Sequence, residues 1–229
     1  MNSPTRILMM VSGALGRRCA SLLADLPSLA LTLADPDASL PDLDGHQLVA
    51  LVTQRPFPAV AAALDQACWS AAIPWLHAQL CGHRFRVGPV IVPPSTPCWE
   101  CLRRRLSSLA PDLPAHEAVE AAAMSGSSDP WFRGELGPLT TQVAALTAAQ
   151  IVALATRTAP TSLASASPSD MGQFWEGDAI FGLLRGRRFA RIGRCPRCSP
   201  MRADDSVRFV AEQLGRRFVH AAPDRGAPS

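Results

Sequence analysis

Two Cys-x-x-Cys pairs constrain this chain more than any other feature of its sequence. They are Cys98-Trp-Glu-Cys101 and Cys195-Pro-Arg-Cys198, and residues 102–194 separate them. Two such pairs supply the four thiolates of a tetrahedral structural zinc site, in which each pair chelates the metal from one tight loop. A free-standing zinc ribbon would hold its pairs much closer together. The spacing therefore predicts a metal site that ties together two distant parts of one larger domain.

The same cysteines leave two other chemistries open, a redox pair and a catalytic zinc site. Catalytic zinc keeps an open coordination position and usually has three protein ligands, whereas four thiolates close the shell. A structural site is therefore the favoured interpretation. The remaining cysteines, Cys19, Cys68 and Cys81, lie in apolar stretches typical of ordinary buried thiols. An odd total of 7 cysteines suits metal binding in a reducing cytoplasm better than a disulfide scaffold.

Composition indicates a globular chain with its own core. The chain has 229 residues, of which 48% are hydrophobic and 18% charged. No uninterrupted apolar run reaches the roughly 18 residues of a membrane-spanning helix, and no signal peptide is evident at the N-terminus. We expect no membrane partner. The predicted organisation is one domain over residues 1–200, followed by a C-terminal helix and tail over residues 201–229.

The basic residues are unusual because all 22 are arginine; the chain has no lysine and no tyrosine. No lysine is available as a Schiff-base former, a general base or a phosphate-binding ammonium, so any catalytic mechanism must do without one. The net charge is only +3, and the aromatic residues do not interleave with the basic ones. We therefore expect no nucleic-acid partner.

The first third of the chain alternates between strand and helix patterns. Apolar runs predict strands at residues 6–12, 29–34, 47–53 and 73–78, and helical spacing predicts helices at residues 17–24 and 58–72. Strand–turn–helix–strand repetition of this kind favours a doubly wound α/β sheet.

The rest of the chain gives weaker patterns. A strand at 84–94 leads to the first cysteine pair, a helix with a solvated basic face (Arg103 to Arg105) starts at Leu102, and residues 107–129 form a loop with a short helix at 116–124. A helix is expected at 138–156, a linker at 158–171, strands at 179–184 and 187–192, and a final helix at 204–218.

The turn after the first strand is a candidate nucleotide loop. Gly13 and Gly16 follow the strand directly and open a helix, and Asp35 ends the second strand. A dinucleotide loop requires this setting and this acid, but it also requires a third glycine. Two glycines would in any case let the backbone turn tightly into the helix. The three residues are candidates for cofactor binding, and a vestigial loop is the favoured interpretation.

Around the first cysteine pair the sequence resembles a known family. The segment from Val87 to Arg105, Val-Gly-Pro-Val-Ile-Val-Pro-Pro-Ser-Thr-Pro-Cys-Trp-Glu-Cys-Leu-Arg-Arg-Arg, is similar to the signature of ThiF-like, ubiquitin-activating-type proteins of azole and azoline peptide biosynthesis. Asp129-Pro-Trp131, the Ala-rich segment 148–154 and Arg194-Cys-Pro-Arg-Cys198 follow in the same order. The resemblance covers roughly residues 6–200 and implies a truncated Rossmann-like sheet with a structural zinc site made of four cysteines.

The resemblance implies a subunit of a larger machine. In such systems a YcaO-type cyclodehydratase uses ATP to close Cys, Ser or Thr side chains of a precursor peptide into azoline rings. The ThiF-like partner recruits the precursor and activates that enzyme, its zinc is structural, and it often dimerises. The expected role is thus a non-catalytic scaffold, with zinc but no bound ATP.

Two departures from the family pattern bear on this role. Leader-binding members carry a winged-helix module before the ThiF-like domain, whereas here the first strand begins at about Arg6, so direct leader capture lacks its usual module. Adenylating members use an arginine and a lysine beyond the second strand. Here only about a dozen residues follow Asp35 before the third strand. Adenylation of a peptide or carrier-protein carboxylate remains the alternative function, with Arg17, Arg18 or Arg55 as its possible cations.

Four aromatic or imidazole side chains have no settled role from sequence. His77 and His83 could act as a general base, although a core or surface histidine is the commoner case. Trp131 and Trp175 could line a partner interface or pack in the core.

Overall fold

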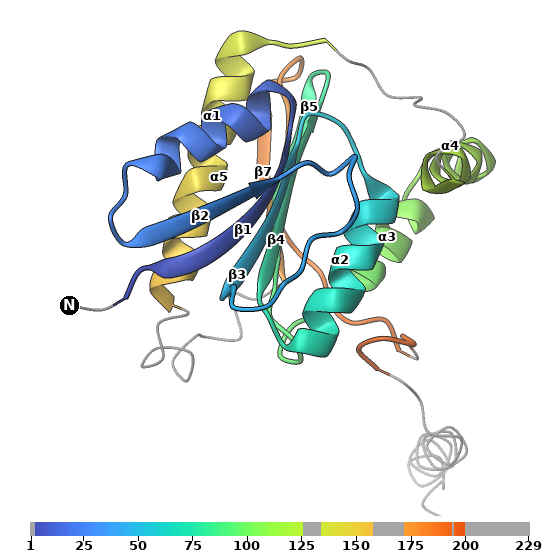
Figure 1. Cartoon of the computed structure of the whole chain (residues 1–229). Helices are drawn as coiled ribbons and strands as arrows, with labels where there is room; N and C mark the ends of the chain where they lie inside the picture. Colours follow the sequence, from blue (N-terminus) through green and yellow to red (C-terminus); the bar gives the residue numbers. More distant parts are fainter. Residues whose placement is uncertain (1–2, 126–133, 158–171, 194, 200–229) are drawn as a thin grey trace, which may run out of the picture.

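The computed structural model describes residues 3–125, 134–157, 172–193 and 195–199. Its centre is a seven-stranded sheet in the order β2-β1-β3-β4-β5-β6-β7. Helices cover both faces of this sheet, so the described chain forms three layers (Figure 1). The doubly wound α/β class predicted from the sequence is confirmed.

One half of the sheet is parallel and is built from the N-terminal part of the chain. Its elements are β1 (Thr5–Ser12), α1 (Gly13–Ala24), β2 (Leu29–Ala34), β3 (Leu48–Thr53), α2 (Pro58–Ala71) and β4 (Trp75–Cys81). β1 pairs in parallel with β2 and β3, and β3 pairs in parallel with β4. β3 is buried along its whole length, as expected of a central parallel strand covered on both faces.

The other half of the sheet is antiparallel. β5 (Arg84–Ile91) pairs with β4, β6 (Gln173–Asp178) pairs with β5, and β7 (Leu183–Arg188) forms the edge. The sheet therefore joins two chain segments that α3 (Trp99–Ser108), α4 (Leu113–Ser125) and α5 (Gly137–Arg157) separate in sequence. This arrangement returns the chain to the neighbourhood of the first cysteine pair.

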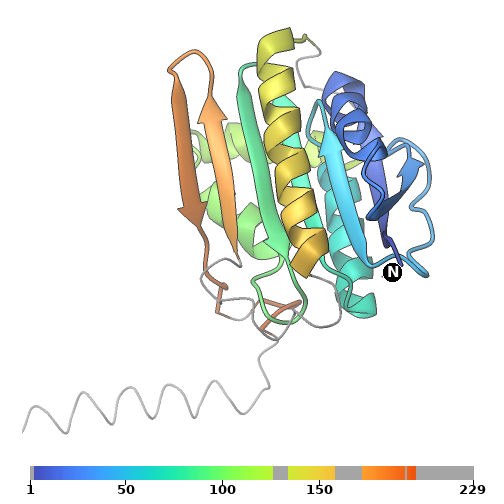
Figure 2. The same ribbon diagram turned by 90° about the vertical axis from the view of Figure 1, so that its left-hand side faces the viewer.

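Each face of the sheet carries its own apolar core. On one face, side chains of β1, β3 and β4 such as Met9, Val52 and Leu76 pack with α1 and α5. On the other face, residues such as Met10, Leu51 and Trp75 pack against α2. Figure 2 shows α5 lying along the first face, and α3 and α4 lie beyond α2 on the second (Figures 1 and 2). Because successive side chains of a strand point to opposite faces of the sheet, neighbouring residues such as Met9 and Met10 belong to different cores.

One described helix, α5, is long and apolar enough over Gly137–Thr156 to cross a membrane by length and composition alone. Half of this segment is buried inside the protein, where Val143, Ala144 and Ile151 belong to the core against β4 and β5. Its apolar character is accounted for by this packing.

Several predicted elements differ from the structure in extent or register. Residues 107–129 were expected to be a loop with a short helix at 116–124; that helix is present but longer, as α4 (Leu113–Ser125), with a proline in its first turn where no backbone N–H is required. The strands expected at 179–184 and 187–192 are instead β6 and β7, and residues 179–182 form the turn between them. β4 begins two residues later and ends three residues later than expected. The linker at 158–171, the helix at 204–218, Asp129 and Trp131 lie outside the described residues.

Candidate metal centre and glycine turn

The four paired cysteines converge as the sequence predicted. Cys98 precedes α3 and Cys101 lies in its first turn, while Cys195 and Cys198 lie in the segment that follows β7. The Sγ atoms of Cys98 and Cys195 are 3.5 Å apart, and those of Cys101 and Cys198 are 3.4 Å apart. All four ligand atoms lie within 4.8 Å of one another. Two loops that are distant in sequence therefore present one compact donor set.

The geometry fits a tetrahedral metal ion. Four sulfurs at zinc–sulfur distances of about 2.3 Å stand about 3.8 Å apart along each edge of the tetrahedron. The Sγ atoms of Cys98 and Cys101 are 3.8 Å apart, and the two cross-pairs are slightly closer. Sulfur donors select soft or borderline ions such as zinc. The cluster can hold a metal ion with no position left for a substrate.

Burial makes the thiols of Cys98 and Cys101 poor acids while no cation is present, whereas at Cys195 burial is outweighed by hydrogen bonds from the backbone N–H groups of Cys198 and Arg197, which lower its pKa to about 7. Cys98 and Cys101 are fully buried, Cys195 is 1% exposed and Cys198 is 8% exposed. Burial raises the pKa of Cys98, and it raises the pKa of Cys101 to about 12. A metal ion reverses this preference because coordination stabilises the thiolate. Folding and metal binding are therefore coupled at this site.

A shell of neighbouring groups orients the sulfurs. The backbone N–H of Ile192 donates to Cys101 Sγ at 3.3 Å, which is the kind of bond that stabilises a ligand thiolate. Trp69, Phe189 and Ile192 pack around the four cysteines and keep water away. Trp69 comes from α2, so the cluster is attached to the α2 face of the sheet as well as to its own two loops.

Asp65 of α2 connects the two cysteine loops and was not singled out from the sequence. Its Oδ1 accepts the backbone N–H of Trp99, between the first pair of cysteines, at 3.1 Å. Its Oδ2 lies 2.9 Å from Nε of Arg197, between the second pair, as an ion pair without hydrogen-bond alignment. Trp75 Nε1 donates to Oδ1 at 3.4 Å. One buried carboxylate thus contacts both halves of the metal site.

The environment of Asp65 is unfavourable for a lone charge. The side chain is 1% exposed, and burial raises its pKa, while the Trp99 N–H and the Arg197 guanidinium act in the opposite direction. A buried carboxylate of this kind is stable only with its partners in place. Asp65 is the single acid in α2, and the sequence gives no sign of its role because both partners come from loops that fold onto the helix from elsewhere.

The glycine turn has a clear structural role. Gly13 has a φ of +66° and a Cβ there would lie 2.3 Å from Gln54 Cβ; a Cβ at Gly16 would lie 2.8 Å from the backbone oxygen of Val52. The close approach of α1 to β1 and β3 therefore requires both glycines. Gln54 Oε1 also accepts the backbone N–H of Leu15 at 2.8 Å, so a side chain of the protein already uses an amide at the start of α1.

Asp35 lies at the same edge of the sheet, since it follows β2 and the glycine turn follows the adjacent parallel strand β1. Its Oδ1 accepts the backbone N–H of Asp37 in a local turn. Asp37 in turn forms an ion pair with Arg55 at 3.0 Å, and Arg55 lies over the ring of Phe57. The loop beyond β2 is thus held by its own Asp35 turn and by Arg55 from the segment after β3, and it is as short as the sequence indicated.

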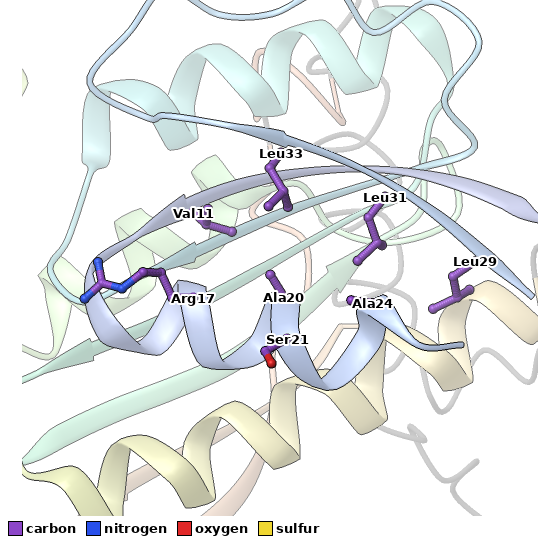
Figure 3. A pocket seen from close by; sticks show the side chains of 8 residues that line it. All are labelled: Val11, Arg17, Ala20, Ser21, Ala24, Leu29, Leu31 and Leu33. Carbon is purple, nitrogen blue, oxygen red and sulfur yellow. The ribbon is translucent and has the colours of Figure 1, made fainter. Parts of the chain in front are cut away.

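A groove of about 500 Å³ runs between α1 and β2 (Figure 3). Leu29, Leu31 and Leu33 form one wall, Ala20 and Ala24 are among the residues of the other, and Arg17 extends at one end. None of the three cofactor candidates lines this groove. Arg18, a second cation considered for adenylation, forms an ion pair with Glu135 at 3.2 Å. Of the three cations considered for adenylation, Arg18 and Arg55 are therefore held in ion pairs, and Arg17 lies at the groove.

The basic face of α3 is not simply solvated, contrary to expectation. Arg103 forms an ion pair with Glu100 at 2.7 Å and with Glu120 of α4 at 2.9 Å, and Arg104 also contacts Glu100. Arg105 donates to the backbone oxygens of residues 190 and 191. The three arginines therefore attach α3 to α4 and to the segment before the second cysteine pair.

The histidines and the remaining cysteines follow the ordinary interpretations. His77 is 3% exposed and stacks on Trp75, whereas His83 lies near the surface, 3.5 Å from Asp178. Cys19 and Cys68 are fully buried and Cys81 is half-buried. Trp175 packs partly buried against the core on the α1 and α5 face.

Comparison with solved structures shows what this fold is similar to. The structure of the heterocyclase TruD matches with a TM-score of 0.63 at 18% identity, over 86% of this chain and 28% of that one. A heterocyclase in complex with substrate and cofactor matches with a TM-score of 0.64 at 16% identity, over 86% of this chain and 26% of that one. E. coli MccB matches with a TM-score of 0.58 at 12% identity, over 86% of this chain and 66% of that one.

The chain thus spans about a quarter of the two heterocyclases and 66% of MccB. At these identities the likeness shows the fold alone. No curated protein matches the sequence at a significant level. A family model described as the ThiF family matches residues 57–189. This range is more than half of the chain and includes every element from α2 to β7. This protein therefore belongs to the ThiF family.

Proposed function

We propose that this protein is a non-catalytic scaffold that activates a YcaO-type cyclodehydratase, which installs azoline rings in a ribosomally made precursor peptide. The likeness to the heterocyclase structures supports this context, because the ThiF-type fold is similar to about a quarter of each of those chains. The proposed partners are the YcaO-type enzyme, a precursor peptide and a second copy of this chain. Capture of the leader peptide is not assigned to this domain.

The observation that carries the non-catalytic role is the structure of the glycine turn. A nucleotide phosphate would require free backbone N–H groups at the start of α1. The N–H of Leu15 is instead bonded to Gln54, whose Cβ also packs against Gly13. No lysine is present to neutralise a phosphate, and Arg18 and Arg55 are held in ion pairs. This supports a vestigial loop, so Gly13, Gly16 and Asp35 are proposed to bind no nucleotide.

We assign zinc as the metal of the tetrathiolate cluster, with Cys98, Cys101, Cys195 and Cys198 as its ligands. Four sulfurs in tetrahedral spacing match its preferred structural coordination. Bound zinc would supply folding free energy and no catalytic position. Its role would be to join the α3 loop and the loop after β7 into one surface that a partner enzyme can recognise.

The test is reconstitution with a precursor peptide and a YcaO-type enzyme from the same gene cluster. The peptide is incubated with that enzyme and ATP, with and without this protein, and its mass is followed. We expect loss of one water per ring only when this protein is present. Equal loss of water without it, or an unmodified peptide in both reactions, would refute the scaffold role.

A second measurement separates the alternative function. If this chain adenylates a carboxylate, it exchanges pyrophosphate into ATP when peptide is present and the YcaO-type enzyme is absent. We expect no exchange. Exchange that disappears in an Arg55→Gln variant would establish adenylation and make the glycine turn a working nucleotide site.

A further inference from the structure

A second cavity lies on the other side of the sheet from the α1 groove. Its volume is about 590 Å³, which is in the range of small-molecule sites. Strands β4 and β5 form its floor, and α3, α4 and the segment before α2 form its walls. Figure 1 shows α3 and α4 on this side of the sheet. Neither the four cysteines nor the glycine turn lines it.

The floor of this cavity carries two buried nitrogen atoms without partners. His77 of β4 is 3% exposed, and its Nε2 has no hydrogen-bond partner in the described part of the chain. Arg86 of β5 is half-buried and its guanidinium lies 5.8 Å from the ring centroid of Phe174, but its buried Nε has no hydrogen-bond partner among the described residues. Gln79 lies directly opposite Arg86 in the strand register and also lines the cavity. Buried polar atoms in proteins are nearly always satisfied, so two in one cavity indicate a missing partner.

The positive charge of Arg86 is not fully balanced by its neighbours. Glu176 faces Arg86 across the β5–β6 pairing, but it forms its ion pair with Arg187 of β7. One carboxylate is therefore shared between two guanidinium groups. Arg84, which also lines the cavity, is paired with Asp178 at 3.1 Å. Counted over Arg84, Arg86, Arg187, Glu176 and Asp178, the net charge is +1, and Arg86 is the member of this group without a carboxylate in ion-pair contact among the described residues.

The other charged groups of the cavity are already matched. Arg103 contacts both Glu100 and Glu120. His116 Nε2 lies 3.2 Å from the hydroxyl of Ser107. No carboxylate in the wall is therefore left over to pair with Arg86 among the residues that the structure describes. The excess charge calls for an anion from outside the chain.

The walls above the floor are mostly apolar. The side chains that provide them come from the segment before α2 and from α3 and α4; they are Phe57, Trp99, Leu102, Leu106 and Val119. An inorganic anion would leave this surface uncovered. A ligand with a charged end and an apolar body would use both parts of the cavity.

We propose that this cavity binds a carboxylate joined to an apolar group, with Arg86 as the ion-pair partner of the carboxylate. His77 and Gln79 provide hydrogen-bonding groups beside it, and the apolar body lies against α3 and α4. The ligand is a small acid or a peptide that presents a terminal or side-chain carboxylate. This site does not depend on the scaffold role, because it concerns what the chain binds by itself.

The protonation states agree with this assignment. Burial, and secondarily the charge of Arg86, lower the pKa of His77 to about 3, so its ring is neutral near pH 7. Burial lowers the pKa of Arg86, and the charge of Glu176 only partly opposes this effect. A bound carboxylate would relieve this cost and strengthen the ion pair in the low-dielectric cavity.

The test is isothermal titration of the full, zinc-loaded chain with three acyl amino-acid probes. They are N-acetyl-leucine, its neutral primary amide, and N-acetyl-leucyl-glutamic acid α-amide, whose carboxylate is on a side chain. We expect at least one of the two acids to bind ten-fold or more tightly than the neutral amide. Tighter binding of N-acetyl-leucine would identify a terminal carboxylate as the preferred group, and tighter binding of the glutamic acid α-amide would identify a side-chain carboxylate.

Variants locate the binding. Arg86→Gln should weaken the acids at least ten-fold and leave the neutral amide unchanged, whereas Arg188→Gln, on the exposed edge strand and opposite Gln173, should change nothing. If Arg86→Gln does not fold, Val119→Trp fills the cavity from the half-exposed side of α4 and should abolish binding. The proposal is overturned if acid and amide bind equally well, or if no probe binds at about 10 mM, roughly the weakest useful affinity. Full binding by Arg86→Gln or by Val119→Trp would also overturn it.

Discussion

Replacing Asp65 by asparagine should destabilise the protein although the substitution keeps the size of the side chain. The carboxylate is 1% exposed and contacts Trp99 and Arg197, one residue from each cysteine loop. Asparagine retains an oxygen that can accept the Trp99 N–H, but it removes the negative charge that Arg197 faces. The side chain of Arg197 is 23% exposed, so solvent recovers part of the loss.

Breaking a fully buried ion pair by removing one partner costs about 3–5 kcal/mol. Because Arg197 is partly exposed, we expect Asp65→Asn to lower the free energy of unfolding by about 1–3 kcal/mol. Asp65→Ala also leaves the N–H groups of Trp99 and Trp75 without an acceptor, and each buried unpaired donor costs about 1–3 kcal/mol. Alanine should therefore be clearly worse than asparagine, at about 3–5 kcal/mol.

Urea unfolding of the zinc-loaded proteins, followed by circular dichroism, measures these differences. Asp37→Asn is the matched control, because that carboxylate is 62% exposed and also pairs with an arginine; its effect should stay below about 1 kcal/mol. A double-mutant cycle of Asp65→Asn with Arg197→Gln should show coupling of about 1 kcal/mol or more. If Asp65→Asn matches wild type within about 0.5 kcal/mol, the carboxylate does not join the two loops and the reasoning fails.

Three further predictions concern other parts of the fold. Cys98→Ser should lose the metal and much of the stability while Cys19→Ser, a buried cysteine outside the cluster, keeps full metal content by elemental mass spectrometry. Gly16→Ala should lower the free energy of unfolding by about 1–3 kcal/mol, because its Cβ meets a backbone oxygen of β3; Gly193→Ala, where nothing lies within 4 Å, should be neutral in the same urea experiment. His77 has a folded-state pKa of about 3 against 6.5 unfolded, so the unfolded state binds the proton first and stability falls as pH drops below 6.5. That loss of about 1.4 kcal/mol per pH unit should be absent from His77→Gln, and an identical pH dependence in both proteins would contradict it.

The parallel half of the sheet could be predicted because local pattern and final environment agree there. β2 occupies the predicted range 29–34, and β1 and β3 differ from prediction by one residue at one end. Their apolar runs are long enough to fill a strand buried on both faces, and residues typical of turns lie at the ends of each run. Nothing in these segments favours a competing structure.

The β6–β7 hairpin was predicted in the wrong register for an equally physical reason. The apolar residues Ile180 and Phe181 suggested a strand, but they lie in the turn with 68% exposure each. The strands lie on either side of this turn: β6 buries Phe174, whereas all of β7 is exposed as the last strand of the sheet. Hydrophobic pattern reports burial, so it fails where an edge strand buries nothing.

The cysteine cluster shows where local information ends. The spacing within each Cys-x-x-Cys pair already determined that all four sulfurs could share one ion, because two residues between ligands let one loop chelate from both ends. Asp65, Arg197 and the cavity around Arg86 have no such spacing. Their partners lie on separate elements, so only the packing of α2, α3 and the antiparallel strands brings them together. The sequence by itself determined which four cysteines can share one ion and where the first three parallel strands lie; the tertiary structure decided which buried charges are paired and which one is left without an anion.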